Sequence, residues 1–267
     1  MAYHHKNRPI DVILPAGGRI PEAFAQQVGT PIKALIPFGC KTILGRTIET
    51  FRATPRIGRM VVIGDEETLA EGNRYGAEGG LREGTTGIEN IFRGLQWLRE
   101  TAPQPASHVL IAATDLPFLS LEATEAFLDA CPASADIAIP VVLASAYQTR
   151  FPNSVNVFNT LKEGEVTLGC LFLVEAETLM KARPHLERLF EARKNQWALA
   201  RILGLPTIAR LLSKRLSLVH IETKCRQVLG CTGSAVWGSS PELAYDIDEH
   251  DEYLYALRHF ASQQGDR

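Results

Sequence analysis

Short apolar runs alternate with segments of helical pattern along the first half of the chain. Each run is only a few residues long and is bounded by Gly, Pro or charged residues, as buried strands are. The runs lie at residues 12–14, 59–64, 108–113 and 136–142. Helical patterns follow three of these runs, at residues 43–51, 88–98 and 121–130. Strands that alternate with helices at this spacing predict an α/β fold with a mostly parallel central sheet.

Length and composition predict one soluble domain. A chain of 267 residues with 45% hydrophobic and 22% charged residues can bury one large core, so we expect residues 1–267 to form a single domain. The net charge of −2 argues against a nucleic-acid partner, which requires a basic surface. The five cysteines lack any C-x-x-C pair, which predicts reduced thiols in the cytoplasm and no structural zinc. No stretch approaches the ~20 apolar residues of a membrane span.

The first run leads directly into a turn, Pro15-Ala16-Gly17-Gly18-Arg19. Glycines directly after a strand let the backbone adopt left-handed angles and approach a ligand closely. The amides of such a turn suit phosphate oxygens, and the guanidinium of Arg19 adds donors. Lys33 follows fourteen residues later. These residue types are consistent with a triphosphate pocket, and equally with a tight turn that has no function.

Asp115 follows the run at 108–113. Open α/β sheets place ligand chemistry at the carboxyl ends of central strands, where this carboxylate is expected. The alternative is that Asp115 caps the helix at 121–130. Ser120 can provide that cap, which leaves Asp115 available for function.

The order of these pieces resembles the signature of the nucleotidyltransferases with the glycosyltransferase-A-like fold. The matching segments are Leu14 to Arg19, Lys33, the turn from Pro37 to Leu44, the Asp115-Leu116-Pro117 element and an acidic closing element at 244–253. Molybdenum-cofactor guanylyltransferases and sugar-phosphate nucleotidylyltransferases belong to that group. The chain departs from the pattern at Pro15, where the family has Ala, and at Ile32, which splits the usual Pro-Lys pair.

The resemblance implies transfer of a nucleoside monophosphate from an NTP to a phosphorylated small-molecule acceptor, with release of pyrophosphate. It implies a Rossmann-like sheet, triphosphate binding by residues 15–19 and Lys33, and Mg²⁺ held by Asp115 with Asp246 or Asp248. Asp246 matches the first position of the closing element and is the favoured partner. Asn90 starts the helix that lies over the nucleotide in the family, so it contacts base or phosphate, or else stabilises its own helix.

The remaining segments carry weaker expectations. Residues 65–83 are charged and Gly-rich and predict a surface loop, whereas 154–158 and 165–174 predict strands. The resemblance implies that these strands form the floor of the acceptor pocket. Tyr147 and Arg150 are candidate acceptor contacts in the loop before those strands. A helical insertion is expected at about 180–220. Its apolar face at 205–219 is expected to be buried, either in the domain or in a homodimer, which makes membrane association unlikely.

Two other functions are compatible with the same fold. A glycosyltransferase that uses a nucleotide-sugar places an Asp-x-Asp after a central strand, where this chain has Asp115-Leu116-Pro117. A non-catalytic nucleotide-binding protein would not need Lys33 and Asp115, and both are present. These residues therefore favour the nucleotidyltransferase.

Overall fold

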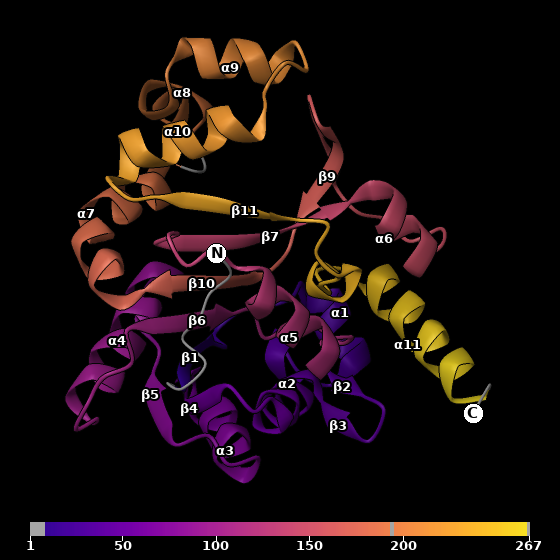
Figure 1. The fold of residues 1–267 in the computed structure, drawn as a ribbon. Coiled ribbons are helices and arrows are strands. Elements are labelled where there is room, and N and C mark those ends of the chain that lie inside the picture. The colour runs from indigo at the N-terminus through magenta and orange to yellow at the C-terminus, as the bar shows by residue number, and fades with distance from the viewer. Residues whose placement is uncertain (1–8, 193–194, 266–267) are drawn as a thin grey trace.

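The computed structural model describes residues 9–192 and 195–265 and places nine strands in one central sheet (Figure 1). These strands are β1 (Ile10–Pro15), β4 (Ile57–Gly64), β5 (Gly79–Arg82), β6 (His108–Ala112), β7 (Ile137–Leu143), β8 (Asn159–Leu161), β9 (Gly164–Leu168), β10 (Leu171–Glu175) and β11 (Gly233–Trp237). A separate hairpin pairs β2 (Pro37–Phe38) with β3 (Lys41–Thr42). The predicted α/β fold with a mostly parallel sheet is confirmed.

The strand order is β5-β4-β1-β6-β10-β7-β9-β8, with β11 paired to β7. Strand β1 pairs in parallel with β4 on one side and with β6 on the other. The chain therefore moves outward from β1 through β4 to β5, and then returns to the opposite side of β1 at β6. This reversal creates a topological switch point at the carboxyl ends of β1 and β6, where open α/β sheets bind ligands.

Helices cover both faces of the sheet. They are α1 (Glu22–Val28), α2 (Ile43–Ala53), α3 (Glu66–Arg74), α4 (Gly87–Glu100), α5 (Leu121–Ala130), α6 (Ala144–Arg150), α7 (Ala176–Ala192), α8 (Gln196–Leu203), α9 (Leu205–Leu212), α10 (Leu218–Leu229) and α11 (His250–Gly265). Two 3₁₀ turns lie at Lys33–Leu35 and Pro241–Leu243.

Alternation along β1 divides the core between the two faces. Val12 and Leu14 pack in one cluster with α2 and α5, and Ile13 packs in the other with α4 and α7. Hydroxyl side chains begin the helices that cover these faces. Thr42 accepts from the amide of Gly45 at the start of α2, and Ser120 accepts from the amide of Ala123 at the start of α5. The cap predicted at Ser120 is thus confirmed.

Three predictions about local structure are wrong. Residues 65–83 form α3, which Asp65 caps, and the edge strand β5. The two glycines of β5 interrupt the apolar alternation by which a strand is predicted. Residues 154–158 belong to no strand, and Val155 and Val157 are exposed rather than packed. The run at 165–174 is two strands, β9 and β10, separated at Gly169, where an added Cβ would approach the carbonyl of Leu243.

The helical insertion is longer and less buried than the sequence predicts. Helix α7 packs on the sheet through Leu179, whereas α8, α9 and α10 group together beyond β11, on the opposite side of the sheet from β4 and β5 (Figure 1). The pattern at 205–219 is not one helix, because residues 213–217 separate α9 from α10. Helix α9 has no buried residue, so the expected burial of its apolar face is wrong.

Candidate active site

The turn after β1 is a site of close approach, not of left-handed backbone. Neither Gly17 nor Gly18 has a positive φ, which corrects the sequence expectation. An added Cβ on Gly17 would lie 1.8 Å from a carboxylate oxygen of Glu83, whereas one on Gly18 would make ordinary contact with Lys33 at 3.4 Å. The absence of a side chain at Gly17 therefore lets the carboxylate of Glu83 lie directly over the turn.

Arg19 closes this turn with three bonds. Its guanidinium donates to the carbonyl of Gly17 at 2.8 Å, and to carboxylates of Glu83 at 2.8 Å and Asp65 at 3.3 Å. Asp65 and Glu83 come directly after β4 and β5, respectively, so both lie at the carboxyl end of the sheet. The sequence analysis predicts neither residue as part of the site, because the composition of 65–83 is that of a surface loop. The signal was present in Asp65, which follows a buried strand in the same way as Asp115.

Asn90 lies in the first turn of α4, next to the same cluster. Its side-chain oxygen accepts from the amide of Gly84 at 2.6 Å, and its amide nitrogen would lie 3.7 Å from a Cβ on Gly17. Thr86 provides the helix cap by accepting from the amide of Glu89. Asn90 is therefore not the cap: it fixes the loop before α4 against the glycine turn.

Backbone hydrogen bonds bring Lys33 to the turn, although Ile32 separates it from Pro31. Arg19 and Ile32 form an isolated antiparallel bridge, and the amide of Lys33 donates to the carbonyl of Gly18 at 3.0 Å. The side chain then points to the other half of the site. Its ammonium lies 3.1 Å from a carboxylate oxygen of Asp115 and also contacts Asp248.

Asp115 lies in the turn that follows β6, and the closing segment of the chain is bonded to it. The amide of Ile247 donates to the carbonyl of Asp115 at 3.2 Å, which places Asp246 and Asp248 on either side of this bond. The segment at 244–249 belongs to no strand, although the resemblance implies that the closing element is one. The other carboxylate oxygen of Asp115, Oδ1, is buried and has no hydrogen-bond partner among the described residues.

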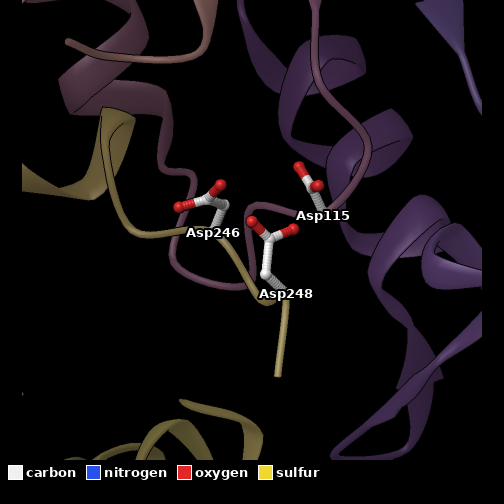
Figure 2. Close-up of side chains that lie close together, drawn as sticks. All are labelled: Asp115, Asp246 and Asp248. Atoms are coloured by element: carbon white, nitrogen blue, oxygen red, sulfur yellow. The ribbon is translucent and has the colours of Figure 1, made fainter. Parts of the chain in front are cut away.

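The three aspartates converge, as Figure 2 shows. One carboxylate oxygen from each of Asp115, Asp246 and Asp248 lies within 4.8 Å of the other two. Burial, and secondarily the negative charge of Asp115, raises the pKa of Asp246 to about 6. Carboxylates that crowd one another in this way are stabilised by a cation.

The donor set suits Mg²⁺. Hard divalent cations bind carboxylate oxygens, and Mg²⁺ uses one or two carboxylates together with water and substrate phosphates. The unpartnered Oδ1 of Asp115 and the half-buried carboxylate of Asp246 supply such ligands. Asp248 is more exposed and is engaged by Lys33, which suits a supporting role.

The two candidate acceptor contacts, Tyr147 and Arg150, pack between structural elements. Tyr147 and Arg150 are on α6 rather than in a loop, and Tyr147 is buried against Phe151 and Tyr245. Arg150 donates to Glu242 at 2.7 Å and lies 2.9 Å from His259. These side chains hold α6, the 3₁₀ turn at Pro241–Leu243 and α11 together, so the predicted acceptor role is not supported.

The site residues thus form two adjoining groups at the switch point of the sheet. Gly17, Arg19 and Asn90 gather around Glu83, and Lys33 gathers with the three aspartates. The bond between Lys33 and Gly18 joins the groups. Pro15 is the last residue of β1, and Ala16 follows it in the turn. The amide of Ala16 donates to the carbonyl of Ile63 at 2.7 Å.

Comparison with known proteins agrees with this geometry. The sequence model of the MobA-like NTP transferase domain matches residues 12–214. A search of curated protein sequences finds no significant match. Among solved structures, a hypothetical transferase from Thermus thermophilus is 30% identical, with a TM-score of 0.80, over 92% of this chain and 99% of that one.

Two more distant structures share the fold. The 4-diphosphocytidyl-2C-methyl-D-erythritol synthase of Anaerococcus prevotii is 12% identical, with a TM-score of 0.58, over 95% of this chain and 96% of that one. A CMP:2-keto-3-deoxy-manno-octonic acid synthetase complexed with CTP is 12% identical, with a TM-score of 0.57, over 97% of this chain and all of that one.

Proposed function

This chain belongs to the family of MobA-like NTP transferase domains, and we propose that it transfers a nucleoside monophosphate from an NTP to a phosphorylated small molecule. One observation carries this proposal. The ammonium of Lys33 and the carboxylates of Asp115, Asp246 and Asp248 meet beside a glycine turn at the switch point of the sheet. Positive charge suits a triphosphate there, and clustered carboxylates suit the cation that accompanies it.

The chain's own groups bind and orient the triphosphate in this proposal. Its oxygens bind to the amides of Gly17 and Gly18 and to the guanidinium of Arg19. To make this contact, Arg19 gives up its hydrogen bonds to Glu83 and Asp65. Lys33 lies between this turn and the aspartates, so its ammonium contacts the phosphates nearest the reacting centre. These contacts hold the α-phosphorus in line with the incoming nucleophile.

Asp115 and Asp246 would hold Mg²⁺, with Asp248 in support. When bound, Mg²⁺ offsets the negative charge that builds on the phosphoryl oxygens and on the leaving group. An acceptor phosphate oxygen attacks the α-phosphorus, the bond from that phosphorus to the bridging oxygen breaks, and pyrophosphate leaves. No covalent enzyme intermediate is required.

The names of two of the similar solved structures refer to cytidylyl compounds. Because these proteins are only 12% identical to this chain, the likeness shows the fold and not the base. We also propose a cytoplasmic location, in keeping with five free thiols.

Pyrophosphate release tests the proposal. The protein is incubated with each NTP, Mg²⁺ and a panel of phosphorylated acceptors. Release that depends on one NTP and one acceptor is expected, and Asp115→Asn should abolish it while the protein stays folded. Asp129→Asn is the matched control, because Asp129 is an exposed carboxylate on α5. Near-wild-type release by Asp115→Asn would overturn the assignment, and turnover of nucleotide-sugars without pyrophosphate release would instead indicate a glycosyltransferase.

A further inference from the structure

The helical insertion exposes large apolar side chains. Trp197 on α8 is 82% exposed, and Leu205 and Leu212 on α9 are 74% and 80% exposed. Leu205 and Leu212 are seven residues apart, so they lie on the same face of α9. Exposed apolar side chains that gather on adjacent elements mark a surface for interaction with a partner or a membrane.

The same insertion is strongly basic, although the protein is not. Residues 196–229 contain six Lys or Arg residues and one acidic residue, a net charge of +5, so the rest of a chain with a net charge of −2 carries −7. Arg201, Arg210, Lys214 and Arg215 are exposed. Within residues 9–192 and 195–265, none of the six basic side chains forms a salt bridge.

This distribution of charge decides between the possible occupants. A second copy that met the same surface across a two-fold axis would bring +5 against +5, which opposes association. An anionic lipid surface complements the basic side chains, and its acyl boundary accommodates Trp and Leu side chains beside them. Stable attachment requires two such signals, and the insertion supplies both an apolar and an electrostatic one.

We propose that α8 and α9 bind peripherally to the surface of an anionic lipid bilayer. Trp197, Leu205 and Leu212 enter the boundary between headgroups and acyl chains. Arg201, four residues after Trp197 on α8, and Arg215, just after α9, contact lipid phosphates. This replaces the sequence expectation that membrane association is unlikely, which depended on burial of the apolar face. Among the described helices, none is both long and apolar enough to span a bilayer.

Co-sedimentation of the full chain with vesicles tests this. Vesicles of phosphatidylcholine with about 30% phosphatidylglycerol should bind the protein at least tenfold more tightly than phosphatidylcholine alone at physiological salt. Arg201→Gln with Arg215→Gln should weaken binding roughly twenty-five-fold, since each basic residue near such a surface contributes about fivefold. Arg74→Gln is the matched control, because the Arg74 side chain is 74% exposed on α3, outside the insertion.

The apolar signal is tested separately. Trp197→Ala and Leu212→Ala should each weaken binding roughly tenfold, since both side chains would leave water on attachment. Val157→Ala, at a position 77% exposed outside the insertion, should have no effect. Emission of the wild-type protein should shift to the blue with anionic vesicles, and Trp197→Phe should abolish that shift.

Two outcomes would overturn the proposal. Equal binding to neutral and anionic vesicles, or none to either, would remove the electrostatic basis. A wild-type dimer that Leu212→Glu converts to a monomer in light scattering would show that the surface is a protein interface. Each of these side chains is exposed, so circular dichroism should show all variants folded.

Discussion

The ammonium of Lys33 lies 3.1 Å from a carboxylate oxygen of Asp115, although 82 residues separate the two in the sequence. The same ammonium contacts Asp248, so one positive charge bridges the two chain segments that supply the aspartates. The proposed substrates would change this arrangement. A cation would take over the neutralisation of the carboxylates, and Lys33 would then be available to the phosphates.

Lys33→Ala is expected to lower turnover by about 10²-fold, because it removes a charge that stabilises the transition state. The structure adds a second expectation that separates this role from a structural one. Without Lys33 the aspartates lack their cationic partner, so Mg²⁺ should raise the melting temperature of the variant more than that of the wild type. Pyrophosphate release and thermal melts with and without Mg²⁺ measure both. Equal Mg²⁺ shifts in the two proteins would contradict the bridging role.

Asp246→Asn should reduce pyrophosphate release more than Asp248→Asn. Asp246 is half-buried and crowded by Asp115, whereas the Asp248 side chain is 59% exposed and pairs with Lys33. We expect a loss of about 10²-fold or more for Asp246→Asn and about 10-fold for Asp248→Asn. The Mg²⁺ concentration for half-maximal release should rise in the same order. Asp251→Asn, in the exposed first turn of α11, is the control. The reverse order would assign the principal ligand to Asp248.

Gly17→Ala is expected to raise the KM for NTP while it leaves the protein folded. The added methyl group would meet the carboxylate end of Glu83 at 1.8 Å, and this flexible end can move away. The folding cost should therefore stay below about 1 kcal/mol, less than overpacking costs in a rigid core. Displacement of Glu83 and Arg19 should disturb the triphosphate pocket. Gly18→Ala, which makes only ordinary contacts, is the comparison, and an equal KM for the two variants would contradict the close-approach argument.

The cysteines should differ in reactivity with maleimides at neutral pH. Cys40 is exposed, whereas burial raises the pKa of Cys131 to about 12 and also raises that of Cys170. The thiolate is the reactive form, so Cys40 should react first, and Cys131 and Cys170 only after unfolding. Mass spectrometry of the labelled peptides measures this, and rapid labelling of Cys131 in the folded protein would contradict its burial.

The same shift predicts a pH dependence of stability. The pKa of Cys131 is higher in the folded protein than its ordinary value of 9.0, so the unfolded chain loses that proton first. The contribution of Cys131 to stability is therefore complete below pH 9 and is lost as pH rises from about 9 to about 12. Urea denaturation at pH 8 and pH 10.5 measures the free energy of unfolding of the wild type and of Cys131→Ala. The loss of this free energy between the two pH values should be smaller for the variant.

Patterns within a few residues are sufficient for four strands of the sheet and for the start of one helix that covers it. Apolar runs predict β1, β4, β6 and β7, and the hydroxyl of Ser120 predicts the start of α5, because burial and capping depend on local spacing. The same local reasoning failed at β5, whose glycines lack a strand pattern, and at 154–158, whose alternation is not used for packing.

Residue types together with the family resemblance named the parts of the candidate site: the glycine turn, Arg19, Lys33, Asp115 and the closing aspartates. Their arrangement was decided by the tertiary structure. Strand order brought the ends of β1 and β6 together, and the Ile247–Asp115 bond brought in the closing segment. The carboxylate over Gly17 comes from Glu83, the residue directly after the edge strand β5, which local patterns do not predict.

The exposed face of α9 shows the same division. Its sequence determined that Leu205 and Leu212 lie on one face, since helical periodicity requires only local spacing. Whether the domain covers that face depends on where the helix lies relative to the sheet. The tertiary structure places α8–α10 beyond β11 and leaves α9 without a buried residue. Local periodicity therefore determined which side chains are grouped, and long-range packing decided which of those groups stay in contact with water.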